Sequence, residues 1–242
     1  MAAHEAQMPF IRNLASSDRK LRTASIDSLK AFLSSRSSLP LPEALKLWKG
    51  LYFAHWMTDR PAPQQRLAAD LALLADALPR ASCRAVWFAA FWDVMGQQWP
   101  QIDKLRLDKF LLLVRRVFAA QVRYSARGEG CDEVAAVLAE WPFEESGDLR
   151  KVPLGLRLHV LDLWVDELER EGCLAEEDAE GRALVDKVGE MVQGLLHCPV
   201  KQVRERARES YDDDRLPWAE KGEDEDEEMD DEEEEEWGGI DG

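Results

Sequence analysis

The side chains that could do chemistry in this 242-residue chain are widely spread, with one exception described below. Metal and disulfide sites need ligands at short, regular spacings, and the four cysteines form no CxxC pair. We therefore expect reduced, packed thiols, no metal site and no cofactor. The chain also lacks the phosphate-binding loop GxxxxGK[ST], the GxSxG nucleophile turn and the zinc motif HExxH, which predicts a protein that is not an enzyme and has no small-molecule substrate. The cysteines are Cys83, Cys131, Cys173 and Cys198.

The exception is a concentration of positive charge between residues 101 and 128, which hold seven bases and two acids, a net charge of +5. At the helical angle of about 100° per residue, Lys109, Arg116, Arg123 and Arg127 fall nearly opposite the apolar face. Such a face could follow RNA phosphates or bind an acidic partner, and an ordinary solvated helix face is the alternative. The first candidates for RNA or partner binding are Lys104, Arg106, Lys109, Arg115, Arg116, Arg123 and Arg127, followed by Arg150, Lys151, Lys201, Arg204, Arg206 and Arg208.

Nine tryptophans form a second unusual feature. Trp residues inside predicted helices are expected in the core, and those in loops or at helix ends are candidate anchors for a protein interface. The interface candidates are Trp99, Trp141, Trp218 and Trp237. His55 and His159 lie among apolar helix neighbours, so we expect them to be hydrogen-bonded packing residues.

The elements that must position these residues are helices, because apolar residues recur at helical spacing in nearly every segment and alternating strand patterns are absent. About ten helices joined mostly by short turns indicate an all-α fold, an irregular HEAT-like α-solenoid, with a compact helical domain as the alternative. They are predicted at residues 9–16, 18–36, 42–59, 63–78, 82–99, 103–126, 131–140, 153–170, 175–196 and 200–210. The helix at 153–170 has two apolar faces, as stacking between two neighbours requires, and leaves Asp162, Asp166 and Glu169 for solvent or a partner.

The formal net charge of −17 is concentrated at one end of the chain. Residues 220–242 hold 15 acids and one base, a net charge of −14, which leaves −3 for residues 1–219. A segment of this composition cannot bury enough apolar surface to fold. We expect a flexible N-terminus at 1–8, a helical domain at 9–210 and a disordered acidic tail at 211–242. No apolar run is long enough to span a membrane and no signal peptide is evident, so we expect a soluble intracellular protein.

Several blocks resemble the nucleolar ribosomal RNA processing protein 1 family, also called the Nop52 family. They are residues 47–52 (LWKGLY), 56–61 (WMTDRP), Gln64-Gln65, Phe91-Trp92 with Met95 and Trp99, 102–116 (IDKLRLDKFLLLVRR), 152–162 (VPLGLRLHVLD) and 166–168. The blocks keep the family's order and extend the resemblance over about residues 8–200. No general helical pattern requires them.

The resemblance implies an all-helical, HEAT-like scaffold without catalytic activity, located in the nucleolus of the nucleus, which assembles precursors of the large ribosomal subunit. It also implies partners among other assembly factors, including a Brix-domain protein and a β-propeller protein, with precursor ribosomal RNA close by. The acidic tail would confer solubility or bind basic ribosomal proteins, with Trp237 and Ile240 as a small apolar anchor. The alternative function is a general protein-binding solenoid adaptor whose acidic tail binds basic cargo.

Overall fold

The computed structural model describes residues 13–14, 16, 18–126 and 131–219. These residues form nine α-helices from α3 to α11 and two short 3₁₀ helices, with no strand among them, which confirms the predicted all-α fold. The predicted flexible N-terminus at 1–8 and residues 220–242 of the predicted tail lie outside the described residues. Within the described ranges, no helix is both long and apolar enough to cross a membrane.

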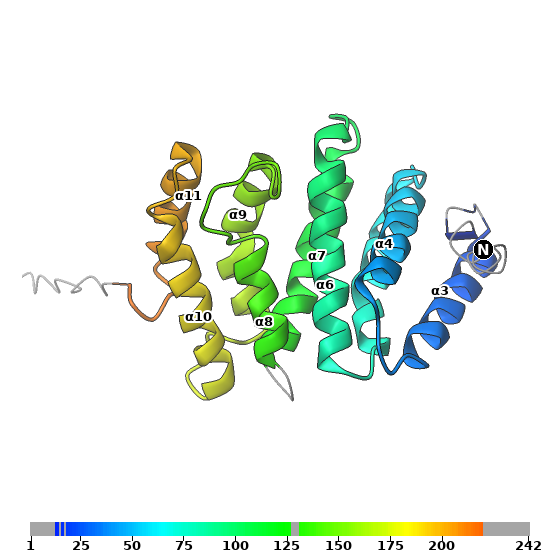
Figure 1. The fold of residues 1–242 in the computed structure, drawn as a ribbon, viewed down its shortest axis with the longest axis horizontal. Coiled ribbons are helices and arrows are strands. Elements are labelled where there is room, and N and C mark those ends of the chain that lie inside the picture. The colour runs from blue at the N-terminus through cyan, green and yellow to red at the C-terminus, as the bar shows by residue number, and fades with distance from the viewer. Residues whose placement is uncertain (1–12, 15, 17, 127–130, 220–242) are drawn as a thin grey trace, which may run out of the picture.

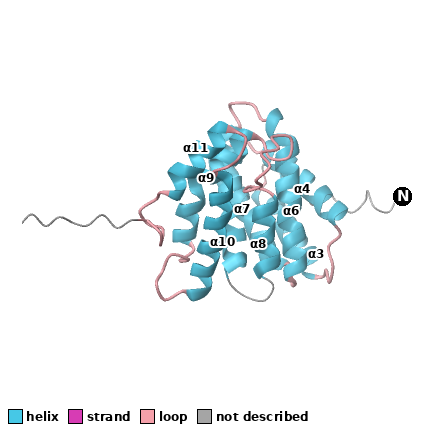
Figure 2. Cartoon of the chain, turned by 60° about the vertical axis from the view of Figure 1, so that its left-hand side comes forward, coloured by secondary structure: helices cyan, strands magenta, loops and turns pink. Residues whose placement is uncertain are grey.

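The helices form a row of antiparallel pairs, as a solenoid requires (Figure 1). One layer contains α4, α6, α8 and α10, and the other contains α5, α7, α9 and α11, with each helix touching its neighbours in the same layer. Figure 2 shows the same stack from a second direction. The helix bounds are α3 Arg19–Ser34, α4 Leu41–Trp56, α5 Pro61–Ala72, α6 Ala81–Gln98, α7 Leu107–Ala126, α8 Cys131–Glu140, α9 Leu154–Arg170, α10 Ala179–Leu195 and α11 Lys201–Tyr211.

Large aromatic side chains pack the helices together both within a layer and between the two layers. Trp48 of α4 packs against Trp87 of α6 with ring centroids 4.7 Å apart, and its indole N–H donates to the Trp87 carbonyl. Trp92 donates to the Gln121 side chain of α7, so the indole that packs α6 is also hydrogen-bonded. Trp48, Trp87, Trp92 and Trp164 are all fully buried, which agrees with their predicted core positions.

Local chemistry explains why several helices begin or end away from their predicted positions. The helix expected at 103 begins at Leu107, because the Asp103 carboxylate accepts hydrogen bonds from the backbone N–H groups of Leu105 and Arg106 and forms a turn first. The helix expected at 63–78 begins earlier, at Pro61, whose fixed φ suits a first helical turn. Its last part is a separate 3₁₀ helix, η1, at Leu73–Ala77.

The packed chain continues past the boundary predicted at residue 210. Leu216 is buried, and Trp218 stacks on Tyr211 with ring centroids 4.9 Å apart. A methyl group added to Gly189 of α10 would lie 2.3 Å from the Trp218 ring, so this glycine is what allows the indole to approach the helix. The tail expected from residue 211 therefore begins with a segment, residues 212–219, that packs against the last helical pair.

Candidate nucleic-acid interface

The predicted basic residues of α7 occupy two different environments. Lys109 lies at the start of the helix, against the end of α4, whereas Arg115, Arg116 and Arg123 face α5 and α9. Arg127 lies outside the described residues. The single basic face predicted from helical angles is therefore divided by the packing of neighbouring helices.

At the first of these places, which we call the Lys109 junction, the lysine is only 6% exposed. Its Nζ donates to the backbone carbonyls of Trp56, at 2.6 Å, and Thr58, at 3.1 Å. The Asp59 carboxylate lies 3.8 Å from the same Nζ. Burial lowers the pKa of the lysine, and Asp59 acts in the opposite direction. Lys109 thus fixes the turn that follows α4, and its ammonium, predicted to bind RNA, is buried and engaged by backbone carbonyls.

His55 belongs to the same junction and is fully buried. Its Nε2 lies 3.1 Å from the Lys109 carbonyl, which can only accept, so this nitrogen carries the proton. Burial lowers the pKa of His55 to about 4, with the nearby Lys109 charge as a smaller cause in the same direction. A neutral, hydrogen-bonded imidazole agrees with its predicted packing role.

The other candidates near the start of α7 remain closer to solvent. Lys104 is exposed and has no ion pair among the described residues. Arg106 pairs with Asp103 and lies over the Trp56 ring, 4.9 Å from its centroid. These residues border the junction but do not join the arginines farther along the helix.

The second place is an open groove across α7, which we call the arginine groove. Small and apolar side chains of α5, η1 and α7 form part of its lining, and charged side chains of α7 and α9 complete it. Arg115, Arg116 and Arg123, all predicted candidates, lie in it together. The complete lining is Ala69, Ala72, Leu73, Leu112, Arg115, Arg116, Ala119, Arg123, Glu167, Arg170 and Glu171.

One buried carboxylate organises two of the arginines. Glu167 is 1% exposed and accepts hydrogen bonds from Arg115 Nε and from Arg170 Nη1, the latter at 2.8 Å. Arg115 also reaches the Asp166 carboxylate at 3.3 Å. The buried anion needs these cations, so Arg115 has a structural role as well as a position in the groove.

The other two arginines differ in their freedom to bind a ligand. Arg123 Nε donates to Glu171 at 3.0 Å, and although burial would lower its pKa, this hydrogen bond and the Glu171 charge raise it. Arg116 has no carboxylate partner among the described residues, and its buried Nε has no hydrogen-bond partner there. Four arginines against two glutamates leave the groove net positive, and Arg116 is its least committed cation.

The sequence analysis did not predict that the α9 residues Glu167 and Arg170 would line the groove. Asp166, predicted to face solvent or a partner, is partly exposed and accepts hydrogen bonds from Arg115 and from Arg215, the latter at 3.1 Å. Asp162 pairs with Arg206, and Glu169 pairs with Arg215 at 2.6 Å. The sequence feature that could have indicated these contacts is the pair of apolar faces on 153–170. A helix packed between two neighbours brings the charged residues beside its apolar faces into contact with those neighbours.

The second group of basic candidates is mostly engaged within the chain. Arg206 pairs with Asp162 and Glu209, and Arg204 donates to the Cys198 carbonyl at 2.6 Å. Lys201 pairs with Glu205, and Lys151 lies 3.5 Å from Glu140. Arg150 and Arg208 are exposed. None of these side chains lines the arginine groove.

The tryptophan candidates that the structure describes have contacts inside the chain. Trp99 is half-buried against Gly155 of α9, 3.1 Å from where a Cβ would stand. Trp141 lies beneath the Lys151 ammonium, 4.6 Å from the ring centroid, and Trp218 packs as described above. Trp237 lies outside the described residues. Partner contacts for these four side chains remain a prediction.

Two apolar side chains that were not singled out are more exposed than these tryptophans. Leu105 is 94% exposed and Met57 is 65% exposed. They belong to the segments 102–116 and 56–61 that the Lys109 junction joins. Exposed side chains in two segments that a buried lysine holds together are candidates for a protein contact.

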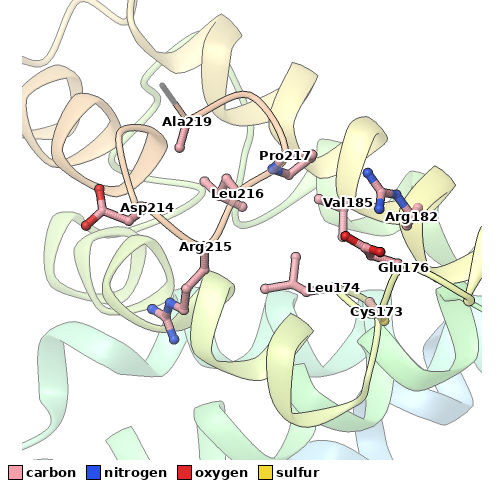
Figure 3. A pocket seen from close by; sticks show the side chains of 10 residues that line it. All are labelled: Cys173, Leu174, Glu176, Arg182, Val185, Asp214, Arg215, Leu216, Pro217 and Ala219. Atoms are coloured by element: carbon pink, nitrogen blue, oxygen red, sulfur yellow. The ribbon is translucent and has the colours of Figure 1, made fainter. Parts of the chain in front are cut away.

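The remaining cavity of interest, about 210 Å³, lies beside the segment after α11 (Figure 3). Of the two arginines in its lining, Arg215 is already engaged by Asp166, Glu169 and Asp213, and no histidine lines the cavity. Across the described ranges, no three His, Cys, Asp or Glu side chains gather closely enough to hold a metal ion. The lining comprises Cys173, Leu174, Glu176, Arg182, Val185, Asp214, Arg215, Leu216, Pro217 and Ala219.

Comparison with known proteins adds the family context. The family model Nop52, described as a nucleolar protein, matches residues 5–239. Ribosomal RNA processing protein 1 homolog B of Homo sapiens is 30% identical over 182 residues, which cover 71% of this chain and 23% of the relative. The Drosophila melanogaster ribosomal RNA processing protein 1 homolog is 32% identical over 170 residues, which cover 68% of this chain and 25% of that relative.

A third relative has a similar identity and covers a similar share of this chain. Ribosomal RNA processing protein 1 homolog A of Mus musculus is 29% identical over 173 residues, covering 69% of this chain and 35% of the relative. The aligned part of the chain thus spans between 23% and 35% of the length of these three relatives.

Proposed function

This chain belongs to the Nop52 family, and from that premise we propose that it is a non-catalytic nucleolar scaffold for the assembly of large ribosomal subunit precursors. In this role it holds assembly factors together and contacts precursor ribosomal RNA. Loss of the protein would then block RNA processing indirectly, because the precursor particle would not be assembled correctly. The relatives named for ribosomal RNA processing support this role.

The observation that carries the RNA part of the proposal is the arginine groove. Guanidinium groups bind phosphates in a bidentate manner and stack on bases, and Arg116 has no carboxylate partner among the described residues. Alanine and leucine side chains in the lining give an exposed base an apolar surface to lie on. We infer that RNA crosses α7 between α5 and α9, with Arg116 as its first contact.

The protein part of the proposal places a partner at the other end of α7. Leu105 and Met57 are exposed, and their two segments are fixed in place by Lys109. Because the backbone of the segment that carries Met57 is held by hydrogen bonds from Lys109, it loses little conformational entropy on binding, which favours a specific protein contact. A Brix-domain or β-propeller assembly factor is the partner class that we propose for this surface. The Trp99, Trp141, Trp218 and Trp237 side chains are secondary candidates.

The test uses tagged full-length protein in cells, with nucleolar location and recovery of large-subunit precursor RNA as the readouts. Arg116→Glu should lower RNA recovery while the protein stays folded, because it replaces a groove cation without removing an ion pair. Lys49→Glu is the matched control, since Lys49 is exposed on α4 and does not line the groove. Equal RNA recovery with both variants would contradict the RNA site, and a cytoplasmic location with basic cargo would favour the adaptor function.

A further inference from the structure

The arginine groove and the acidic residues 220–242 carry opposite charges on the same chain. The groove has four arginines and two glutamates, and the acidic segment has a net charge of −14. We propose that residues 220–242 bind in the arginine groove of their own chain and leave it when RNA binds. The competition with RNA rests on the proposed function, whereas the binding of the segment to the groove does not.

A shared carboxylate connects the groove to the segment that leads to residue 220. Asp166 of α9 accepts a hydrogen bond from Arg115 in the groove, at 3.3 Å, and from Arg215, at 3.1 Å. Arg215 also bonds Glu169, which directly precedes Arg170 and Glu171 of the groove lining in the sequence. The chain therefore leaves the described structure only four residues after a side chain that is bonded to the edge of the groove.

The acidic segment begins close enough to the groove to reach it. An extended chain spans about 3.3 to 3.6 Å per residue, so the four residues from Arg215 to Ala219 cover about 14 Å at most. The acidic residues begin directly afterwards, at Glu220. Linked groups at this separation have effective concentrations in the millimolar range, so even a weak contact would be substantially occupied.

Two cations close to the start of the segment, Arg215 and Arg206, are less available than Arg116 of the groove. Arg215 is bound by Asp166, Glu169 and Asp213, and Arg206 is bound by Asp162 and Glu209. In contrast, Arg116 has no carboxylate partner among the described residues. A carboxylate of the acidic segment would supply the partner that Arg116 lacks, in the charge-assisted geometry that arginine favours.

The first arm of the test measures binding of the segment without RNA. The probe is a fluorescein-labelled peptide with the sequence of residues 220–242, and its anisotropy is followed with full-length protein whose own acids at 223–236 are replaced by Asn and Gln. We expect saturable, salt-sensitive binding, weakened about tenfold by Arg116→Glu and unchanged by Lys49→Glu. Wild-type protein should bind the peptide less tightly than the neutralised protein, because its own segment occupies the groove.

Three results would overturn the proposal: no saturable binding of the peptide, equal weakening by both substitutions, or equal binding by wild-type and neutralised protein. The second arm replaces the peptide with a labelled RNA hairpin, for which the neutralised protein should have about tenfold higher affinity than wild type. Peptide binding at Arg116 with no RNA binding would contradict the proposed function alone. RNA binding that depends on Arg116, combined with no peptide binding, would contradict this inference alone.

Discussion

The Lys109 junction and the arginine groove lie on the same helix and use the same kind of charge for different purposes. Lys109 is buried, and its ammonium is satisfied by two backbone carbonyls. Arg116, two helical turns later, is half-buried and has no carboxylate partner among the described residues. The first charge is used by the fold, and the second is available to a ligand.

The difference comes from what each side chain meets across the helix interface. The end of α4 presents carbonyl oxygens that no longer have helical donors, and Lys109 satisfies two such oxygens. The α5 side of the groove presents alanine and leucine, which cannot pair with a guanidinium. On α7, a basic residue is therefore free to bind a ligand where the neighbouring helices offer it no acceptor.

The largest expected effect concerns the junction. Lys109→Met keeps much of the side-chain length but removes the donor, so the Trp56 and Thr58 carbonyls lose a charge-assisted hydrogen bond each. We expect the free energy of unfolding to fall by about 3 to 4 kcal/mol, measured by urea denaturation. Arg116→Met serves as the comparison on the same helix and should cost less than about 1 kcal/mol. Similar losses for the two variants would remove the distinction between the two sites.

The next effect is the pH dependence contributed by His55. Its pKa is about 4 in the folded protein and 6.5 in the unfolded chain, so between these values the unfolded chain binds the extra proton. The contribution of His55 to the free energy of unfolding is therefore fully present above about pH 7. It falls on acidification towards pH 4, by about 3 kcal/mol at most. His55→Gln, which can still donate to the Lys109 carbonyl, should show a smaller decrease in urea denaturation over this range. Parallel pH profiles for the two proteins would contradict a buried neutral imidazole.

A smaller effect is expected at the groove, and it concerns binding. Arg116→Glu should weaken the affinity for a labelled RNA hairpin about tenfold, equivalent to about 1.4 kcal/mol, and reduce its salt dependence. The free energy of unfolding should change by less than about 0.5 kcal/mol, because no ion pair is lost. Anisotropy titrations at two salt concentrations measure the first quantity, and denaturation measures the second. A variant that loses stability and keeps its affinity would reverse the roles of the two regions.

The smallest effect is expected at Lys104, which is exposed and unpaired within the described residues. Lys104→Gln should leave stability within about 0.5 kcal/mol of wild type and lower RNA affinity by less than about threefold. The same titrations apply. A loss as large as that of Arg116→Glu would extend the RNA surface from the groove to the turn before α7.

Helix bounds could be predicted from the sequence where proline or glycine marks the ends of a helix. Pro153 and Gly172 bracket α9, and the helix expected at 153–170 agrees with Leu154–Arg170. The start of α7 could not be predicted, because Asp103 can either cap a helix directly or form a preceding turn, and the sequence does not distinguish the two. The packing of residues 212–219 could not be predicted, because nothing in the sequence indicates that Trp218 packs against Gly189 of α10.

The site was predicted in part for a related reason. Helical angles placed Arg116 and Arg123 on one face, and the structure brings them together with Arg115. The same angles placed Lys109 with them, because angles along one helix carry no information about the carbonyls at the end of α4 that bind its side chain. The pairing of Arg115 with Glu167 could not be predicted either, because it depends on which helix packs beside α7.

Leu216 and Trp218 pack on α10 and α11 and cover the end of the helical stack that the structure describes. A stack of repeats frays from its ends, because a terminal repeat has a neighbour on one side only. Here Trp218 stacks on Tyr211 and donates its indole N–H to the Tyr211 carbonyl at 2.9 Å, so α11 gains a cover that a neighbouring repeat would otherwise provide. Opening of α11 should therefore require the Trp218 contact to break first, and the local stability of the last repeat depends on an aromatic pair outside the repeats themselves.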